Sequence, residues 1–428
     1  MSALFPSRSA RELARRSGAP LSADVLQTAA MIVHDVRARG ETALREHAER
    51  LGDIAPGAPL MLPRATLERT LSDLPEEDRR RLGRVAGRIR EFAEGQRRSI
   101  STYTADIPGG RAGHTVAPVE RAGCYAPGGR YPLPSSVLMT ALTARVAGVA
   151  EVWVASPRPA PMTLAAAAIA GADGFVAAGG AQAIAALAFG AGEVPACDAV
   201  VGPGNAYVTA AKQMIAGRVA IDTLAGPSEL VILADATADP AVVAADLLAQ
   251  AEHDPDALPV LVSIGSLVAE RVTVELERQL ATLPTAQIAA AALAHGGAVV
   301  VRDLDEAVDA CNLLAPEHLE LQIADAAAAV ERLRHFGALF IGAATAETFG
   351  DYGAGPNHVL PTGQSARSAG GLSVLTFLRV RTWLSIEDAA AAQPLIEDAA
   401  WLARVEGLEA HARSAERRLA IGAVARGG

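Results

Sequence analysis

The feature that most constrains the fold is an alternation of short apolar runs and alanine-rich helical stretches through the middle of the chain. The apolar runs are Glu151–Ser156, Gly174–Ala178, Asp198–Val201, Val219–Ile221, Leu230–Ala234, Pro259–Ser263, Ala298–Arg302 and Ala338–Ile341. Strands that alternate with helices in this way are typical of parallel sheets, because each helix carries the chain back to the start of the next strand. The pattern therefore predicts an α/β fold.

The length and the flanking patterns predict how this fold is divided. A chain of 428 residues, half of them hydrophobic, is long enough for two or more domains. We expect two Rossmann-like α/β domains with parallel sheets, plus N- and C-terminal helical extensions. The expected parts are an N-terminal extension of residues 1–25, a first domain of residues 26–119 and 228–370, a second domain of residues 120–227, and a helical tail of residues 371–428.

Charge and residue usage exclude several classes of function. The net charge of −10 disfavours a nucleic-acid partner. Lys212 is the only lysine and sits in a helical Ala-Ala-Lys-Gln-Met run, so Schiff-base chemistry is nearly excluded. Three distant cysteines, Cys124, Cys197 and Cys311, indicate neither a disulfide framework nor a thiolate zinc site. Without an apolar signal core or a run of about 18 apolar residues, we expect no membrane partner and a reducing cytoplasm.

One helix carries a pair of metal-ligand types near its end. Asp239 and Pro240 read as an N-cap followed by proline at the first helical position. Gln250 and His253 then lie three residues apart in the last turns, on one face of the expected helix. An amide oxygen and an imidazole both bind divalent metals. Taken alone, such a pair more often marks a solvated helix end, here near Pro255.

Three glycine-rich turns each follow an expected strand and precede a helical stretch. They are Ala126-Pro127-Gly128-Gly129, Gly179-Gly180-Ala181-Gln182 and Gly202-Pro203-Gly204-Asn205. Glycine lets the backbone approach a ligand, and a helix N-terminus offers free N–H groups to a phosphate. Each turn alone serves equally to reverse the chain. Three in succession favour one crevice at the carboxyl ends of a sheet, where dinucleotides bind.

Further polar residues occur in turns and loops. Ser228 lies in the turn Ala225–Glu229, and Glu317 stands beside His318 after Pro316. A histidine of ordinary pKa is suited to act as a general base at neutral pH. Asp351 and His358 share a polar loop, so Asp351 is a candidate metal ligand. Glu406 and His411 are five residues apart, about 140° on a continuous helix, and a solvated helix face remains open for them.

From about residue 25 to about residue 415 the chain resembles the histidinol dehydrogenase family. Three blocks carry the resemblance: Ile221-Asp222 through Ala225-Gly226-Pro227-Ser228-Glu229 to Ala249-Gln250-Ala251-Glu252-His253, then Ala315-Pro316-Glu317-His318-Leu319-Glu320, then Asn357-His358-Val359-Leu360-Pro361. The resemblance implies an intertwined homodimer with shared active sites, one zinc ion per subunit and NAD as the second cofactor. It implies oxidation of L-histidinol to L-histidine through histidinal, the last steps of histidine synthesis.

The resemblance also implies a role for each matching residue. The zinc ligands would be Gln250, His253, Asp351 and His411, the last from the partner subunit. Glu317 would activate water and His318 would be the general base. Substrate contacts would come from Ser228, His358 and Glu406, together with Gln250, His253, Glu317, Asp351 and His411. NAD contacts would come from Tyr125, Gln182 and Asn205, so that residues 120–227 would bind NAD and the tail would reach the partner subunit.

The sequence departs from the family pattern at two places. The family usually has Pro-Ala-Lys where this chain has Thr143-Ala144-Arg145. After Phe377-Leu378 it usually has two basic residues and threonine, whereas this chain has Arg379-Val380-Arg381-Thr382-Trp383. Related dehydrogenases that differ in these neighbourhoods oxidise other polar alcohols, including sulfonated diols. A paralogue with another amino or sulfonate alcohol as substrate is therefore the first alternative. A catalytically silent NAD- or metal-binding protein is the second, and the intact pair Glu317 and His318 argues against it.

Overall fold

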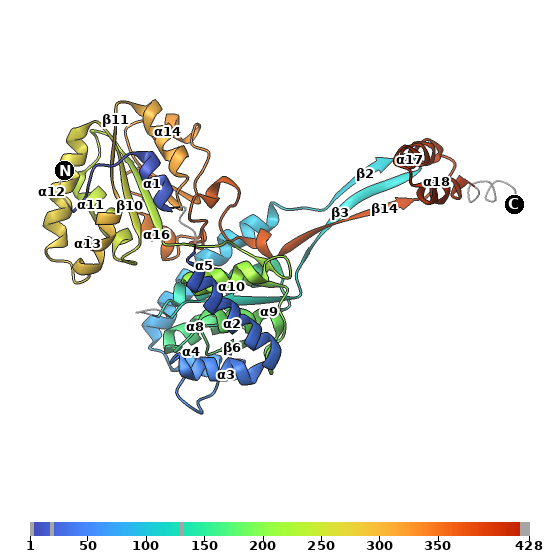
Figure 1. The fold of residues 1–428 in the computed structure, drawn as a ribbon, viewed down its shortest axis with the longest axis horizontal. Helices are drawn as coiled ribbons and strands as arrows, with labels where there is room; N and C mark the ends of the chain where they lie inside the picture. Colours follow the sequence, from blue (N-terminus) through green and yellow to red (C-terminus); the bar gives the residue numbers. More distant parts are fainter. Residues whose placement is uncertain (1–3, 18–20, 129–131, 420–428) are drawn as a thin grey trace. The chain divides into compact units, whose positions relative to one another are not determined.

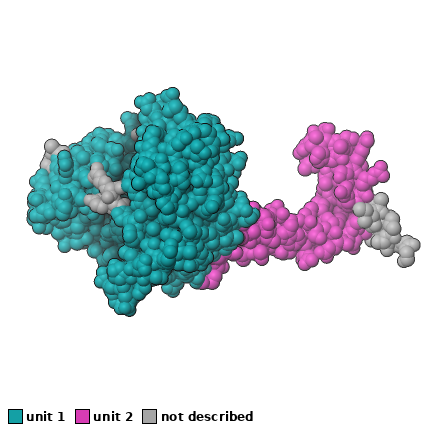
Figure 2. Space-filling model, turned by 90° about the horizontal axis from the view of Figure 1, so that it is seen from below, with its two compact units in different colours: residues 1–96, 119–377 teal, residues 97–118, 378–428 magenta. Residues whose placement is uncertain are grey.

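The computed structural model describes residues 4–17, 21–128 and 132–419 of the chain. These residues form two compact units, one of residues 1–96 and 119–377 and one of residues 97–118 and 378–428 (Figure 2). The first unit contains two sheets with parallel strands and helices packed against them (Figure 1). The predicted α/β class is confirmed. Within the described ranges, each helix is too short or too polar to span a bilayer.

The first sheet has six strands in the order β1-β6-β5-β4-β7-β8. All neighbours are parallel except the edge strand β1, which runs antiparallel to β6. The strands are β1 (Met61–Pro63), β4 (Arg121–Tyr125), β5 (Glu151–Ala155), β6 (Gly174–Val176), β7 (Ala199–Val201) and β8 (Ala220–Ile221). One core joins this sheet to the helices α2 (Ala23–Arg39), α3 (Glu41–Arg50), α9 (Gly180–Phe189) and α10 (Ala206–Ile215).

Shorter helical elements complete the same half of the unit. The helix α4 (Arg64–Asp73) packs against α8 (Pro161–Ala170), and α8 packs against the π-helical turn η1 (Leu138–Leu142). The turn η1 lies between α6 (Pro134–Val137) and α7 (Thr143–Ala147), and α7 contacts η3 (Val374–Phe377). The long helix α5 (Glu76–Arg98) follows α4 in the chain.

The second sheet has five strands, all parallel, in the order β11-β10-β9-β12-β13. They are β9 (Glu229–Ala234), β10 (Leu258–Ile264), β11 (Gly297–Val301), β12 (His318–Gln322) and β13 (Ala338–Ile341). One core includes α11 (Pro240–Ala251), α12 (Ser266–Leu280) and α13 (Ala286–His295), and a second includes α1 (Ala10–Ser17), α14 (Leu304–Leu314) and α15 (Ala326–Val330). The central strand β9 is therefore covered on both faces.

Residues 26–119 do not all join the sheet with which we had grouped them. We expect them to group with residues 228–370, but β1 is an edge strand of the six-stranded sheet, and α2 and α3 pack in the core of that sheet. The reason is physical, since Val33, Val36 and Leu44 bury their side chains against that core. The helix α1, expected as an extension, instead packs on α14 and buries Leu13.

The second unit combines a three-stranded antiparallel sheet with two helices. Its strands are β2 (Tyr103–Ile107), β3 (Gly110–Pro118) and β14 (Leu378–Ile386), in the order β14-β3-β2, and its helices are α17 (Gln393–Val405) and α18 (Glu409–Glu416). Within the tail that we expected to be helical, β14 is a strand. It pairs with β3 over nine residues, which is a long-range contact that no local pattern reveals.

Candidate active site

The two predicted catalytic residues and two of the four predicted metal ligands, His253 and Asp351, meet at the amino ends of two neighbouring strands. Ser228 precedes β9, His318 begins β12, and Glu317 lies just before it. Together with His253, Asp351 and His358 these residues line one cavity of about 170 Å³. Pro203 and Gly204, from the third glycine-rich turn, line the same cavity. The site is thus bordered by the five-stranded sheet and by a turn of the six-stranded sheet.

The carboxylate of Glu317 is buried and held by two donors. Its Oε2 accepts a hydrogen bond of 2.7 Å from Ser228 Oγ and one of 2.9 Å from the Glu229 backbone N–H. Burial raises the pKa of Glu317 to about 8, although the two hydrogen bonds oppose that shift. A carboxyl group with such a pKa can take up and release a proton near neutral pH.

His318 presents one free ring nitrogen to the site. Its Nδ1 lies 3.0 Å from the carbonyl oxygen of Glu229, and since a carbonyl only accepts, Nδ1 carries the proton. Among the described residues Nε2 has no hydrogen-bond partner, and it lies 3.7 Å from Glu347 Oε1 and 4.0 Å from Asp351 Oδ1. Burial lowers the pKa of His318. The ring is thus set up as a neutral base with its lone pair on Nε2.

Two predicted metal ligands lie close to an acidic residue that the sequence did not single out. Ligand atoms of His253, Asp351 and Glu347 all lie within 4.8 Å of one another. Gln250 is fully buried, and neither atom of its amide has a hydrogen-bond partner within the described part of the chain. Nitrogen and oxygen donors of this kind suit zinc, and the unpartnered amide fits a residue that awaits a ligand.

The helix that carries Gln250 begins as predicted and ends earlier than predicted. Asp239 Oδ1 accepts from the Ala241 N–H at 2.8 Å, which caps the helix, and Pro240 is its first residue. The helix ends at Ala251, so His253 lies beyond it. The expectation of two ligands on one helical face is therefore wrong, and a turn brings His253 Nε2 to within 3.6 Å of Asp351 Oδ2.

His358 closes another side of the cavity. Its Nδ1 lies 2.9 Å from the carbonyl oxygen of Asp351, and its Nε2 lies 3.4 Å from Ser136 Oγ. Burial lowers the pKa of His358, although the nearby Asp351 opposes that shift. The adjacent Asn357 donates to the Met139 carbonyl at 2.8 Å and to Thr143 Oγ1 at 3.3 Å. Thr143, at one of the two departures from the family pattern, thus contacts the residue next to His358.

Arg145, at the same departure, has a structural role. Its guanidinium donates to the carbonyl oxygens of Gly171, Val149 and Ala150 and pairs with Asp173. These contacts join α7 to the chain around β5. Arg145 does not line the cavity that contains Glu317 and His318.

Glu406 and His411 belong to the second unit and lie on two helices. Glu406 caps the end of α17, Gly407 has a φ of +78°, and α18 begins at Glu409. A continuous helix through both residues is therefore excluded, because Gly407 adopts a left-handed conformation. Both side chains are exposed.

The glycine-rich turns lie together at the carboxyl end of the six-stranded sheet, as predicted from their position. They follow β4, β6 and β7, which are parallel to one another in that sheet. The Tyr125 hydroxyl accepts from the Gly180 N–H at 3.1 Å. A Cβ on Gly128 or on Gly179 would come within 3 Å of Pro157, so both turns pack against this residue. Gly129 lies outside the described residues.

Gln182 has a fixed orientation and a free acceptor. Asp53 Oδ2 accepts from Gln182 Nε2 and from the Gly179 N–H, both at 2.8 Å. Since a carboxylate only accepts, the amide oxygen Oε1 faces away, and it is buried without a partner among the described residues. Sequence reasoning missed Asp53, which is distant in the chain. Asn205 Oδ1 accepts from the N–H groups of Tyr207 and Val208 and caps α10.

The chain's only lysine stabilises the turn after β7. Lys212 is 1% exposed, donates to the Gly202 carbonyl at 3.0 Å and forms an ion pair with Asp222. Asp222 also accepts from the Gly202 N–H at 2.7 Å. The N–H and the carbonyl group of Gly202 are thus both held in hydrogen bonds, which fixes the turn. Because the Lys212 amine makes these contacts, it is not free for covalent chemistry.

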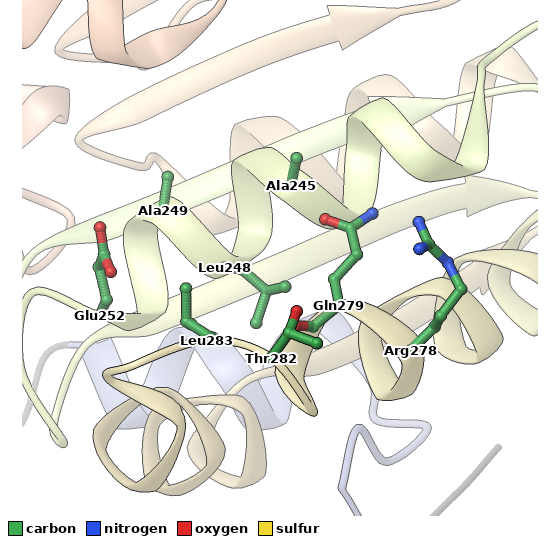
Figure 3. Close-up of a pocket in the computed structure, with 8 residues that line it drawn as sticks. All are labelled: Ala245, Leu248, Ala249, Glu252, Arg278, Gln279, Thr282 and Leu283. Carbon is green, nitrogen blue, oxygen red and sulfur yellow. The ribbon is translucent and has the colours of Figure 1, made fainter.

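A further hollow lies on the outer side of α11 and α12 (Figure 3). It is lined by Ala245, Leu248, Ala249, Glu252, Arg278, Gln279, Thr282 and Leu283. Glu252 Oε2 accepts from Thr285 Oγ1 there. This hollow contains none of the predicted site residues, so the cavity around Glu317 and His318 remains the candidate active site.

Comparison with known proteins agrees with this geometry. The family description "Histidinol dehydrogenase" matches residues 15–419. The chain belongs to the histidinol dehydrogenase family. It is 44% identical to the histidinol dehydrogenase of Thermus thermophilus, over 97% of this chain and all of the relative, and 44% identical to that of Dechloromonas aromatica, over 91% of each. The crystal structure of a histidinol dehydrogenase from Elizabethkingia anophelis matches with a TM-score of 0.90 at 29% identity, over 98% of this chain and 99% of that one.

Proposed function

We propose that this chain oxidises L-histidinol to L-histidine through histidinal, with two successive hydride transfers to NAD. The observation that carries the proposal is one cavity in which the free Nε2 of His318 and the carboxyl group of Glu317 lie beside His253 and Asp351. Membership of the histidinol dehydrogenase family supports the choice of substrate.

The residues divide the proton transfers between them. NAD, when bound, supplies the hydride acceptor for each oxidation. His318 Nε2 takes the hydroxyl proton of the alcohol and releases it to solvent, and Glu317 takes a proton from the water that adds to the aldehyde carbon. His318 then takes the hydroxyl proton of the hydrate as the second hydride leaves. In total one alcohol, one water and two NAD⁺ give one carboxylate, two NADH and three protons, which balances atoms and charge.

The proposed metal site uses Gln250, His253 and Asp351, together with His411 of the partner subunit. Zinc, one ion per subunit, would hold the imidazole and amino nitrogens of the substrate when bound. The unpartnered amide of Gln250 and the close approach of His253 to Asp351 support this assignment. Ser228, His358 and Glu406, the last again from the tail, are proposed to contact the substrate.

The proposed NAD site lies at the glycine-rich turns of residues 120–227. Tyr125, Gln182 and Asn205 are the proposed contacts, and the buried Gln182 Oε1 is an acceptor for a donor group on the cofactor. The backbone of the turn after β7 is fixed at Gly202. The next two residues, Pro203 and Gly204, line the cavity that contains Glu317.

We place the reaction in a reducing compartment, the cytoplasm. Cys124, Cys197 and Cys311 are free and buried. Burial raises the pKa of each thiol, which keeps all three protonated and unreactive.

Counting products tests the proposal directly. Purified protein with zinc and excess NAD is expected to form two NADH for each L-histidinol consumed, because both oxidations occur in one site. The measurement follows NADH absorbance against histidinol loss by chromatography. Other amino alcohols and sulfonated diols serve as controls. Faster turnover of one of these controls would favour the paralogue, and no turnover of any alcohol would favour the silent binding protein.

The shared active site is tested by mixing two inactive variants. His411→Ala and His253→Ala are each expected to lose activity, and subunit exchange should restore up to about half of one wild-type dimer per heterodimer by symmetry. The reason is that in a heterodimer one site receives both lesions and the other neither, if the tail acts on the partner. A mixture that stays inactive after exchange, verified by mass spectrometry of tagged subunits, would place the tail in its own subunit's site.

A further inference from the structure

A second buried glutamate, Glu229, touches the reacting pair although the proposed chemistry does not use it. We propose that Glu229 is a positioning residue, which fixes Glu317 and His318 relative to each other and ties them to the segments that connect the two sheets. This inference rests on the proposed function, since it concerns the geometry of the same proton-transfer groups.

The backbone of Glu229 holds both members of the pair. Its N–H donates to Glu317 Oε2 at 2.9 Å, and its carbonyl oxygen accepts from His318 Nδ1 at 3.0 Å. The two groups of one residue therefore set the position of the carboxyl group and the tautomer of the imidazole at once. A shift of this residue would move both groups together.

The side chain of Glu229 anchors that backbone. Glu229 is 3% exposed, and its Oε1 accepts hydrogen bonds from Ser17 Oγ and, at 3.0 Å, from the Gly363 N–H. Gly363 has a φ of +62°, a left-handed conformation that glycine adopts without strain. The neighbouring Thr362 accepts from the Gly226 N–H and lines the active-site cavity.

Glu229 and its two anchoring partners belong to three different segments of the chain. Ser17 ends α1, the last helix on the five-stranded sheet before α2 on the other sheet. Glu229 begins β9, directly after the connection from β8. Gly363 lies in the segment between α16 (Glu347–Asp351) and η3, which contacts α7 and β8. The Glu229 carboxyl group thus joins the end of α1 and the segment before η3 to the start of β9, beside the reacting pair.

The anchoring role of Glu229 requires an oxygen that accepts hydrogen bonds and does not require a negative charge. A buried carboxyl group beside Glu317 is electrostatically unfavourable, and burial together with Glu317 raises the pKa of Glu229 to about 7. Oε1 accepts from both donors whether or not Oε2 carries a proton. Glutamine keeps such an oxygen and alanine does not, so the two substitutions separate anchoring from charge.

The test compares Glu229→Gln, Glu229→Ala and Ser17→Ala in the zinc-loaded enzyme. With alanine, kcat for both L-histidinol and histidinal is expected to fall about 10²-fold, the loss typical of a displacement of about 1 Å in a reacting group. KM should change less than threefold and zinc content should stay constant. Glutamine should retain kcat within threefold of the wild type. Ser17→Ala removes one of the two donors to Glu229 Oε1, so its kcat should lie between those of Glu229→Gln and Glu229→Ala.

Val272→Ala is the matched control for lost stability. Val272 is fully buried in the core around α12 and does not line the cavity. Its variant should lower the melting temperature while kcat stays near that of the wild type. The inference is overturned if Glu229→Ala loses no more kcat than Val272→Ala, or if Glu229→Gln is as slow as Glu229→Ala. If alanine prevents folding, Ser17→Ala with unchanged kcat overturns it. Failure of the proposed function would differ, because the wild type itself would then not oxidise histidinol.

Discussion

Replacing His318 with asparagine is expected to slow oxidation of both L-histidinol and histidinal by roughly 10²–10⁴, the range for loss of a general base. The asparagine amide can still donate to the Glu229 carbonyl, which His318 Nδ1 contacts at 3.0 Å, but it has no counterpart of the free Nε2. Rates measured separately with each substrate test this. Zinc content should hardly change, and a loss of zinc would show that His318 is a ligand.

Glu317→Gln is the matched comparison for this variant. Glutamine keeps an oxygen for the donors Ser228 Oγ and Glu229 N–H, but it does not take a proton. The oxidation of histidinal should therefore slow more than the oxidation of histidinol, since only the second step needs water to be activated. Equal losses in both steps would mean that Glu317 acts through position alone.

Metal removal is expected to bring oxidation to the background rate, and added zinc should restore it. Without an ion, Gln250 keeps two buried amide atoms without partners among the described residues, and nothing orients the substrate nitrogens against His253 and Asp351. Activity and zinc per chain are measured before chelation, after chelation and after zinc is added. Full activity in metal-free protein would contradict the prediction.

The variant His253→Ala adds a control at the level of the ligand. It should bind less zinc than the wild type, while His295→Ala should bind the same amount. His295 is exposed, and its Nδ1 lies 3.8 Å from Asp256 Oδ1. Equal zinc in both variants would remove His253 from the ligand set.

Patterns with a local cause could be predicted from the sequence. The N-cap Asp239 and the following proline identify the start of α11, and the glycine-rich turns after β4, β6 and β7 share one edge of a sheet as expected. The block around Glu317 and His318 identified the pair that lines the cavity with Ser228 and Asp351. In each case neighbouring residues determine the feature.

Features that depend on distant pairing could not be predicted in this way. The strand β14 exists because it pairs with β3, and Asp53, which is 129 residues from Gln182 in the chain, orients it through a direct hydrogen bond. Glu347 joins His253 and Asp351 only because α16 folds over the end of α11. A sequence signal for it does exist, since Glu347 and Asp351 are four residues apart and share a helical face.

The arginine-rich composition of the chain has a practical consequence at Lys212. This is the only side-chain amine in the sequence, and it is 1% exposed beneath the Gly202 turn. A reagent that acylates amines can reach it only when that turn opens. The rate of labelling at Lys212 therefore reports how often this turn, which lies beside the proposed NAD site, opens in the native protein. This measurement needs no engineered probe. A lysine-specific protease would cut the unlabelled chain at Lys212 and would leave the labelled chain uncut at this position.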